Sequence, residues 1–409
     1  MNADQQILTQ LAKEYREVAF APVNEERRVV WESRTRWREC RQQNKMDQLP
    51  WHELDVDGDL KLRCRDADAR IVEDALRKQL YQAKYFPADK VFEPYLELPK
   101  TIEGYHHGVV RREVTLAADE KNDVVSHSYV SQLSSESDLE NLKFPDIRVD
   151  EAKDKKRWEK VSEMVSGILP VRLTGVRMFH CGIWDDLVEA IGTDNFFFFF
   201  ADEPELLHKA ARRMADICQS LIDQLTEKQL FDAYEPTVHC TGAYTDELPQ
   251  DKEKNVRPGD VWTFGLAQML GSVSPQMFEE YEVEYVKPLL EQFGLVYYGC
   301  CEPLHNRIDY IRKIKNVRKI SMSPWADIRA GAEHIHGDYV ISRKPNPAYL
   351  AAASFDPELV RRELQETCRA AKENGCTCEL ILKDVSTVQY HPERLAQWHK
   401  IAVEVAGEW

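Results

Sequence analysis

The last third of the sequence alternates strand-like and helix-like segments, and this alternation limits the fold more than any other feature. Strands are expected in short apolar runs at 295–299, 318–323, 339–343 and 378–384. Helices are expected at 303–314, 325–333, 356–375 and from His391 onward. Four successive strand-helix units predict a parallel sheet with helical crossovers.

Two of the predicted helices carry clear start and stop signals. One has Ser274 as its N-cap, a proline in its first turn and Gly294 at its end. The other begins at an Asp356 cap, also followed by proline, and ends at Gly375. These signals place the helices relative to the strands that follow them.

Two further strands are expected upstream, at 169–176 and 231–239. A helix between them opens with a capping box of Asp202 and Glu205. No glycine-rich dinucleotide or phosphate-binding motif occurs at a strand-to-helix turn, which argues against a doubly wound nucleotide-binding fold. We therefore predict an α/β chain that forms a (β/α)8 TIM barrel.

The first 90 residues differ in character from the rest, being charged, rich in arginine and helical in patches. We predict that residues 1–90 form a helical N-terminal extension packed on the barrel. Residues 91–409 are predicted to form the barrel itself, with its first strand within 91–114.

Composition excludes several classes of partner. The 409 residues include 70 acidic and 54 basic side chains, a net charge of −16 that repels nucleic acid and anionic lipid. No apolar run is long enough to span a membrane, and the first residues lack the pattern of a signal peptide. The ten cysteines are spread irregularly, as thiols of a reducing compartment are. We expect a cytoplasmic protein that acts on a small molecule, and a homodimer as the commonest assembly.

In a parallel α/β barrel the active site lies at the carboxyl ends of the strands. In the segment 231–239, Glu235, Thr237 and His239 alternate with apolar residues and are expected to face the lumen, with His239 nearest the mouth. Polar residues at the same ends of other segments are expected to bind a carboxylate or phosphate of the substrate: Arg172, His180, Arg343, Lys344 and Lys383. Ordinary salt bridges at the rim are the alternative.

The stretch Gly299 to Glu302 falls where a strand ends and contains two adjacent cysteines. Thiolate, imidazole and carboxylate groups are zinc ligands, so Cys300, Cys301, His239 and Glu302 are candidate ligands. Neighbouring side chains on a strand point to opposite faces, so at most one cysteine is expected to bind the ion. Packing without metal is the alternative.

Cys300 is the residue that we most expect at the reaction centre. The other candidate catalytic residues are Glu302, His239 and Asp384, each as a metal ligand or as a general acid or base.

The segments 202–209, 231–239, 274–294 and 356–375 resemble those of the uroporphyrinogen decarboxylase superfamily, over roughly 167–409. This superfamily includes zinc-dependent methyltransferases that serve corrinoid proteins, and the resemblance implies a single barrel. In the methyltransferases the equivalent of the cysteine stretch reads His-x-Cys-Gly, with a further Cys after the last strand. Cys300 matches the family cysteine, whereas Tyr298 stands in place of the histidine and Ser386 near the later cysteine.

The resemblance implies methyl transfer through a zinc-thiolate site, with a rearranged ligand set, acting on a corrinoid protein or a methylated small molecule. The arginine-rich signature of the decarboxylases is not found; "QLPWHELDV" stands near its place. A metal-free decarboxylase of a polycarboxylated, tetrapyrrole-like substrate is the second hypothesis. A non-catalytic barrel that binds a small ligand is the third.

Overall fold

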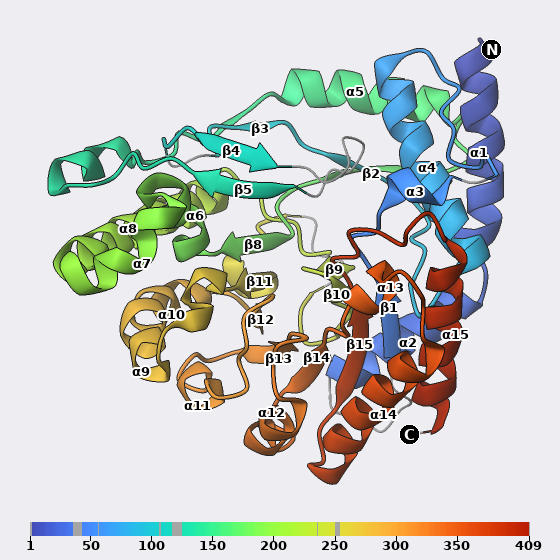
Figure 1. Cartoon of the computed structure of the whole chain (residues 1–409). Helices are drawn as coiled ribbons and strands as arrows, with labels where there is room; N and C mark the ends of the chain where they lie inside the picture. The colour runs from blue at the N-terminus through green and yellow to red at the C-terminus, as the bar shows by residue number, and fades with distance from the viewer. Residues whose placement is uncertain are drawn as a thin grey trace.

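The computed structural model describes residues 2–35, 43–55, 57–105, 108–116, 125–234, 236–249 and 254–408. Its central feature is a seven-stranded parallel sheet in the order β1-β15-β14-β13-β12-β11-β8. The strands are β1 (Gln43–Met46), β8 (Met178–Cys181), β11 (Trp262–Gly265), β12 (Leu295–Tyr298), β13 (Val317–Met322), β14 (Val340–Arg343) and β15 (Cys378–Leu382). Figure 1 shows these strands in an arc. Helices alternate with the strands along the chain, so the fold is mixed α/β.

Helices line the outer side of this arc (Figure 1). They are α6 (Ile183–Ile191), α7 (Thr193–Asp202), α8 (Pro204–Glu227), α9 (Pro275–Phe278), the π-helical turn η4 (Glu279–Val283), α10 (Glu284–Leu290), α11 (Ile308–Ile311), α12 (Ile328–Ile335), α13 (Ala348–Ala351), α14 (Pro357–Glu373) and α15 (Glu393–Glu408). In the portion of the chain that the structure describes, no helix has the length and apolar character needed to cross a lipid bilayer.

The N-terminal region adds helices on one side of the sheet: α1 (Ala3–Ala19), α2 (Val23–Thr35), α3 (Trp51–Leu54), α4 (Ala67–Tyr85) and, later in the chain, α5 (Glu151–Met164). Four two-stranded ladders complete the structure: β2 (Leu96–Pro99) with β7 (Val171–Thr174), β3 (Ile102–Glu103) with β6 (Arg148–Val149), β4 (Glu113–Leu116) with β5 (Ser126–Tyr129), and β9 (Thr237–Val238) with β10 (Thr241–Gly242). Short 3-10 turns are η1 (Glu136–Asn141), η2 (Pro258–Asp260) and η3 (Gln268–Ser272).

The predicted strand-helix alternation is confirmed, since β12, β13, β14 and β15 pair in sequence order. Two predicted caps are also present: the Ser274 side chain accepts from the Met277 N–H, and Asp356 accepts from two N–H groups of the first turn of α14. The predicted capping box at Asp202 is wrong. That residue ends α7, and Pro204 opens α8 without a side-chain cap.

The N-terminal region contributes more to the sheet than its composition indicated. The strand β1, which lies within residues 1–90, pairs with β15 at one edge of the sheet. The prediction that 91–114 supplies the first strand of the main sheet is wrong, because β2 pairs with β7 instead. Among the described residues, the seven-stranded sheet keeps two edges, β1 and β8, without a ladder between them.

The predicted strand 231–239 is also shorter than expected. Only the hairpin strand β9 forms there, paired antiparallel with β10. Glu235, which was expected to face the lumen, lies outside the described residues.

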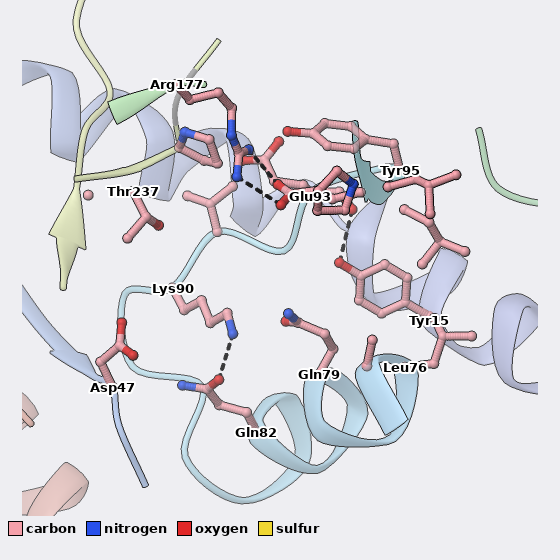
Figure 2. A pocket seen from close by; sticks show the side chains of 18 of the residues that line it. Tyr15, Asp47, Leu76, Gln79, Gln82, Lys90, Glu93, Tyr95, Arg177 and Thr237 are labelled. Carbon is pink, nitrogen blue, oxygen red and sulfur yellow. Dashed lines mark hydrogen bonds and ion pairs between the residues drawn. The ribbon is translucent and has the colours of Figure 1, made fainter. Parts of the chain in front are cut away.

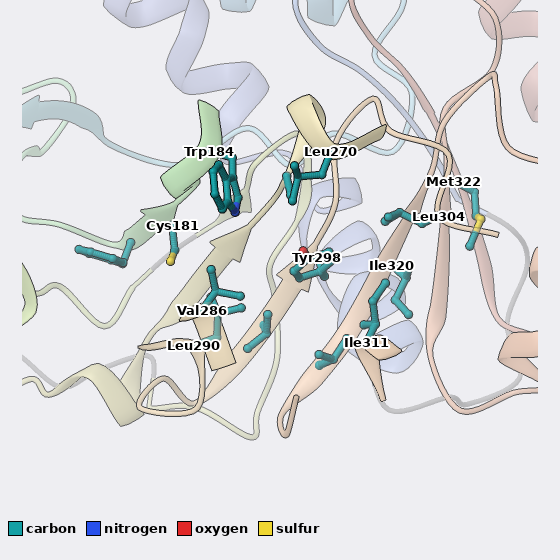
Figure 3. Packing of buried hydrophobic residues seen from close by; sticks show 14 of the residues in the cluster. Cys181, Trp184, Leu270, Val286, Leu290, Tyr298, Leu304, Ile311, Ile320 and Met322 are labelled. Carbon is teal, nitrogen blue, oxygen red and sulfur yellow. The ribbon is translucent and has the colours of Figure 1, made fainter. Parts of the chain in front are cut away.

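Apolar side chains pack on both faces of the sheet, as expected for strands that are buried on both sides. Val296 and Tyr298 of β12 belong to the large core between sheet and outer helices, which Figure 3 shows. Leu295 and Tyr297 belong to a smaller inner cluster. Successive side chains of a strand point to opposite faces of the sheet, and this alternation decides which residues of each strand face the site.

Candidate functional site

The adjacent cysteines lie directly beyond the carboxyl end of β12. Gly299 has a φ of +93°, a conformation that glycine adopts without steric strain. A Cβ at this position would lie 2.3 Å from Cδ1 of Leu304, so a larger residue does not fit. Cys300 is buried, Cys301 is half-buried, and their Sγ atoms are 3.5 Å apart. We call these two residues the thiol pair.

Glu302 holds the loop that carries the thiol pair. Its carboxylate is buried and accepts from the backbone N–H of Cys300 at 2.9 Å and from that of Ala267, in the loop after β11, at 3.1 Å. The Ser321 hydroxyl donates to the Cys300 carbonyl at 2.7 Å. Because both carboxylate oxygens bind backbone N–H groups, the contacts of Glu302 are those of a positioning residue.

Lys383 and Asp384, directly after β15, bring charge to the thiol pair. The Lys383 side chain is only 2% exposed, and its Nζ lies 3.1 Å from Cys300 Sγ and 2.9 Å from Asp384 Oδ2. Cys301 Sγ donates to the same Asp384 oxygen at 3.5 Å. Nε2 of His239 lies 3.3 Å from Lys383 Nζ. These pairwise contacts therefore join two thiols, an ammonium, a carboxylate and an imidazole into one connected group.

Two members of this group have a backbone conformation that non-glycine residues rarely adopt. His239 has a φ of +51° in the turn between β9 and β10, and Asp384 has a φ of +56°. Such conformations cost about 1–3 kcal/mol and concentrate at functional sites. His239 thus reaches the thiol pair through a hairpin turn and not through strand alternation. Its ring stacks on Phe264 of β11, with centroids 4.1 Å apart.

Burial, hydrogen bonds and nearby charges shift the pKa values of the groups in this site. Donation to Cys301 and burial raise the pKa of Cys300. The hydrogen bond received from Cys300 lowers the pKa of Cys301; burial opposes this shift, and Lys383 adds to it. Burial would lower the pKa of Lys383, but the charges of the thiols and Asp384 outweigh it and raise the pKa. Burial lowers the pKa of His239. These shifts favour Cys301 over Cys300 as the thiol that ionises, and the thiolate is the reactive form of cysteine.

The zinc ion that the family resemblance implies does not fit these residues. Tyr298, in place of the family histidine, packs in the outer core, where its hydroxyl donates to Glu282 at 2.8 Å. The Lys383 ammonium contacts Cys300, so a zinc ion on that sulfur would meet a like charge. Across the described ranges, no three His, Cys, Asp or Glu side chains form a group that could hold a metal ion.

The other cations predicted to bind substrate have partners within the protein. Arg172 belongs to β7, which lies outside the seven-stranded sheet, and its Nη2 is 2.6 Å from Asp232 Oδ1. Arg343 lies 3.1 Å from Glu363 and is buried. Lys344, also buried and directly after β14, donates to Ser342 Oγ at 2.6 Å. Among the described residues, Lys383 is the predicted cation that contacts a sulfur.

His180 lies near the thiol pair but outside its contacts. It belongs to β8, a strand that the sequence did not predict, and its ring lies 5.4 Å from that of Phe264. Phe264 therefore lies between His180 and His239 as a shared aromatic surface. Sequence reasoning missed Phe264 because it did not identify β11 as a strand.

Asp185 was also missed. It lies in the first turn of α6, beyond the carboxyl end of β8, and accepts from the backbone and side-chain N–H groups of Gln268 at 3.1 and 3.2 Å. Burial and the nearby Glu302 raise its pKa to about 7. A carboxyl group with this pKa can exchange protons near neutral pH. The segment "HCGIWDD" places two acids after a strand, and this was the available signal.

Comparisons with known proteins bear on the fold. No protein-family profile matches this sequence, and no curated protein matches it significantly. A solved structure of a methyltransferase from Methanosarcina mazei is similar, with a TM-score of 0.50 and 10% sequence identity. The match covers 93% of this chain and 97% of that chain. At this identity the likeness establishes a shared architecture over nearly the whole chain.

Proposed function

We propose that this chain is a barrel enzyme of methyl transfer in which the thiol pair accepts the methyl group. The donor would be a methylated corrinoid on a partner protein or a methylated small molecule. The observation that carries the proposal is the contact of Lys383 Nζ with Cys300 Sγ at 3.1 Å, with Cys301 Sγ 3.5 Å from the same sulfur. The structural likeness to a methyltransferase supports it.

The reaction requires a thiolate sulfur to attack a methyl carbon. The new bond joins sulfur and carbon, and the leaving group departs with the electron pair of the bond that breaks. Lys383 stabilises the thiolate before attack, and a neutral His239 can accept the remaining thiol proton. In this proposal Lys383 supplies the positive charge that zinc supplies in the related methyltransferases. No step requires a metal ion.

The test uses methylcobalamin as the methyl donor, with anaerobic single-turnover assays and mass spectrometry of the protein. Attack on its methyl group releases cob(I)alamin, which is followed by absorbance, and adds one methyl group to the thiol pair. Cys300→Ser and Cys301→Ser are expected to lower the rate at least tenfold. Cys378→Ser, at the opposite end of β15, serves as the control because its buried thiol is remote from the site.

The outcome also separates the other two hypotheses. Absence of methylation in the folded wild-type protein, with methylcobalamin and with iodomethane, would refute methyl acceptance by the thiol pair. A decarboxylase would then need a cationic substrate site, yet Arg172, Arg343 and Lys344 have internal partners. Ligand binding without turnover would support the non-catalytic barrel.

A further inference from the structure

A cavity of about 740 Å³ lies between the N-terminal helices and the β1 edge of the sheet. Its walls come from α1, α4, the segment 90–99 and the start of β8, and Figure 2 shows the side chains that face it. This volume is typical of a small-molecule binding site. The methyl transfer proposed for the thiol pair assigns no role to this cavity.

Most charges that line the cavity are paired. Arg177 binds Glu97 through two contacts of 2.7 and 2.9 Å. Lys45 Nζ lies 3.5 Å from Asp47. Glu93 accepts from the hydroxyls of two tyrosines at 2.6 and 2.7 Å and contacts an arginine of α2 at 3.5 Å. These groups need no ligand to satisfy them.

Lys90 differs from the other charged residues of the cavity. Its Nζ donates to Gln82 Oε1 at 2.6 Å, and no carboxylate of the described residues lies within ion-pair distance. Gln79, which belongs to α4 as Gln82 does, lines the same cavity. In Figure 2, Lys90, Gln79 and Gln82 lie together along one side of the cavity. Lys90 is half-buried, and its ammonium lies 5.4 Å from the centre of the Phe92 ring. A partly desolvated cation with no carboxylate beside it favours binding of an anion.

The remaining walls are mainly apolar. Tyr15, Leu76 and Leu98 line the side toward the N-terminal helices, and Met46 and Met178 line the side toward the sheet. Such walls bind a hydrocarbon or aromatic body. One surplus positive charge at the end of an apolar cavity fits an amphipathic monoanion.

The cavity is linked to the thiol pair through a short chain of contacts. Met178, which lines the cavity, accepts through Sδ the hydrogen bond of the His239 backbone N–H at 3.0 Å. The His239 ring in turn contacts Lys383, whose Nζ contacts Cys300 Sγ. Met178, His239 and Lys383 therefore connect the cavity with the sulfur atoms.

We propose that this cavity binds an apolar or aromatic carboxylate whose anionic group pairs with Lys90. The role of this ligand in the reaction rests on the proposed methyl transfer, whereas its binding can be measured without turnover.

The charge of Lys90 makes the binding pH-dependent. Burial, and then the charge of Lys45, lowers the pKa of Lys90 to about 8. The other charged groups that face it are Asp47 and Glu97, and Arg27 of α2 donates to its carbonyl. Only the protonated lysine attracts an anion, so affinity is expected to fall about tenfold per pH unit above pH 8.

The experiment measures binding of octanoate and of the neutral octanamide by isothermal titration calorimetry. We expect saturable octanoate binding at one site and at least tenfold weaker binding of octanamide. Lys90→Met should lower octanoate affinity at least tenfold, whereas Lys90→Arg should retain the affinity and lose the pH dependence, because arginine stays charged. Lys84→Met, which changes an exposed lysine near the end of α4, is the control. Thermal unfolding checks that each variant folds.

Equal binding of the acid and the amide, or no saturable binding of either, would overturn the proposal. So would unchanged octanoate affinity in folded Lys90→Met. Octanoate binding should persist in Cys300→Ser, which lacks the methyl acceptor. Failure to bind octanoate in a protein that still becomes methylated would refute the cavity assignment alone. Binding without methylation would refute the proposed function alone.

Discussion

Replacing Lys383 by methionine is expected to raise the pKa of the thiol pair. Methionine keeps much of the volume and length of the side chain but removes its charge. The Lys383 ammonium lies 3.1 Å from Cys300 Sγ in a buried position, and its charge also lowers the pKa of Cys301, so the loss of charge acts on both thiols of the pair. The negative form becomes less stable, and the pair ionises at higher pH.

The size of the shift follows from the distance. A unit charge at 3.1 Å contributes about 5 kcal/mol at an effective dielectric constant of ~20 and about 1 kcal/mol in bulk water. These energies correspond to roughly 1 to 4 pKa units. Asp384 is present in both proteins, so its own charge does not change the difference between them. The thiol with the lowered pKa is Cys301, whereas the distance of 3.1 Å is to Cys300, so the lower part of this range applies. We therefore expect a rise of roughly 1–2 units.

The assay is the pH dependence of alkylation by iodoacetamide, with peptide mass spectrometry to assign the label to Cys300 or Cys301. Lys344→Met is the matched control, because Lys344 is also buried but bonds to hydroxyl groups and not to sulfur. Superimposable pH profiles for wild type and folded Lys383→Met would refute the reasoning. An equal shift in both variants would also refute it, since it would assign the effect to buried charge in general.

Three further outcomes are expected. Zinc should be well below one ion per chain by elemental analysis of untagged protein; stoichiometric zinc that is lost in Cys300→Ser would contradict the conclusion that zinc does not fit this site. Gly299→Ala should destabilise the fold by about 2 kcal/mol or more, seen as a lower urea midpoint, because of its φ of +93° and the 2.3 Å approach of Leu304. Burial raises the pKa of Glu282 well above its usual range, so the folded state retains a proton that the unfolded state releases. Stability should fall as pH rises from about 4 toward that pKa, and Glu282→Gln should flatten this slope between pH 5 and 9 in thermal unfolding; an unchanged slope would contradict it.

Local sequence patterns determined the second half of the fold. Short apolar runs, capping residues and helix-ending glycines are local signals, so β12 to β15 and the caps at Ser274 and Asp356 could be predicted from neighbouring residues alone. The same alternation placed Cys300, Cys301 and Lys383 at carboxyl ends of strands. Their presence at one edge of the sheet follows from parallel pairing.

Tertiary structure decided which of these residues meet. The short strands β1, β8 and β11 carry weak local signals and become strands by pairing with neighbours far away in the sequence. The position of His239 depends on a two-residue hairpin and a positive φ, which no period of two could indicate.

Whether a charged residue is paired or available also depends on distant segments. Glu363 neutralises Arg343, while Lys383 is left to contact a thiol. The sequence by itself therefore determined the order of elements and the residue types at the strand ends. Only the packing of the chain decided which charge stands beside which sulfur, because electrostatic and hydrogen-bond contacts depend on distances of a few ångströms between residues remote in sequence.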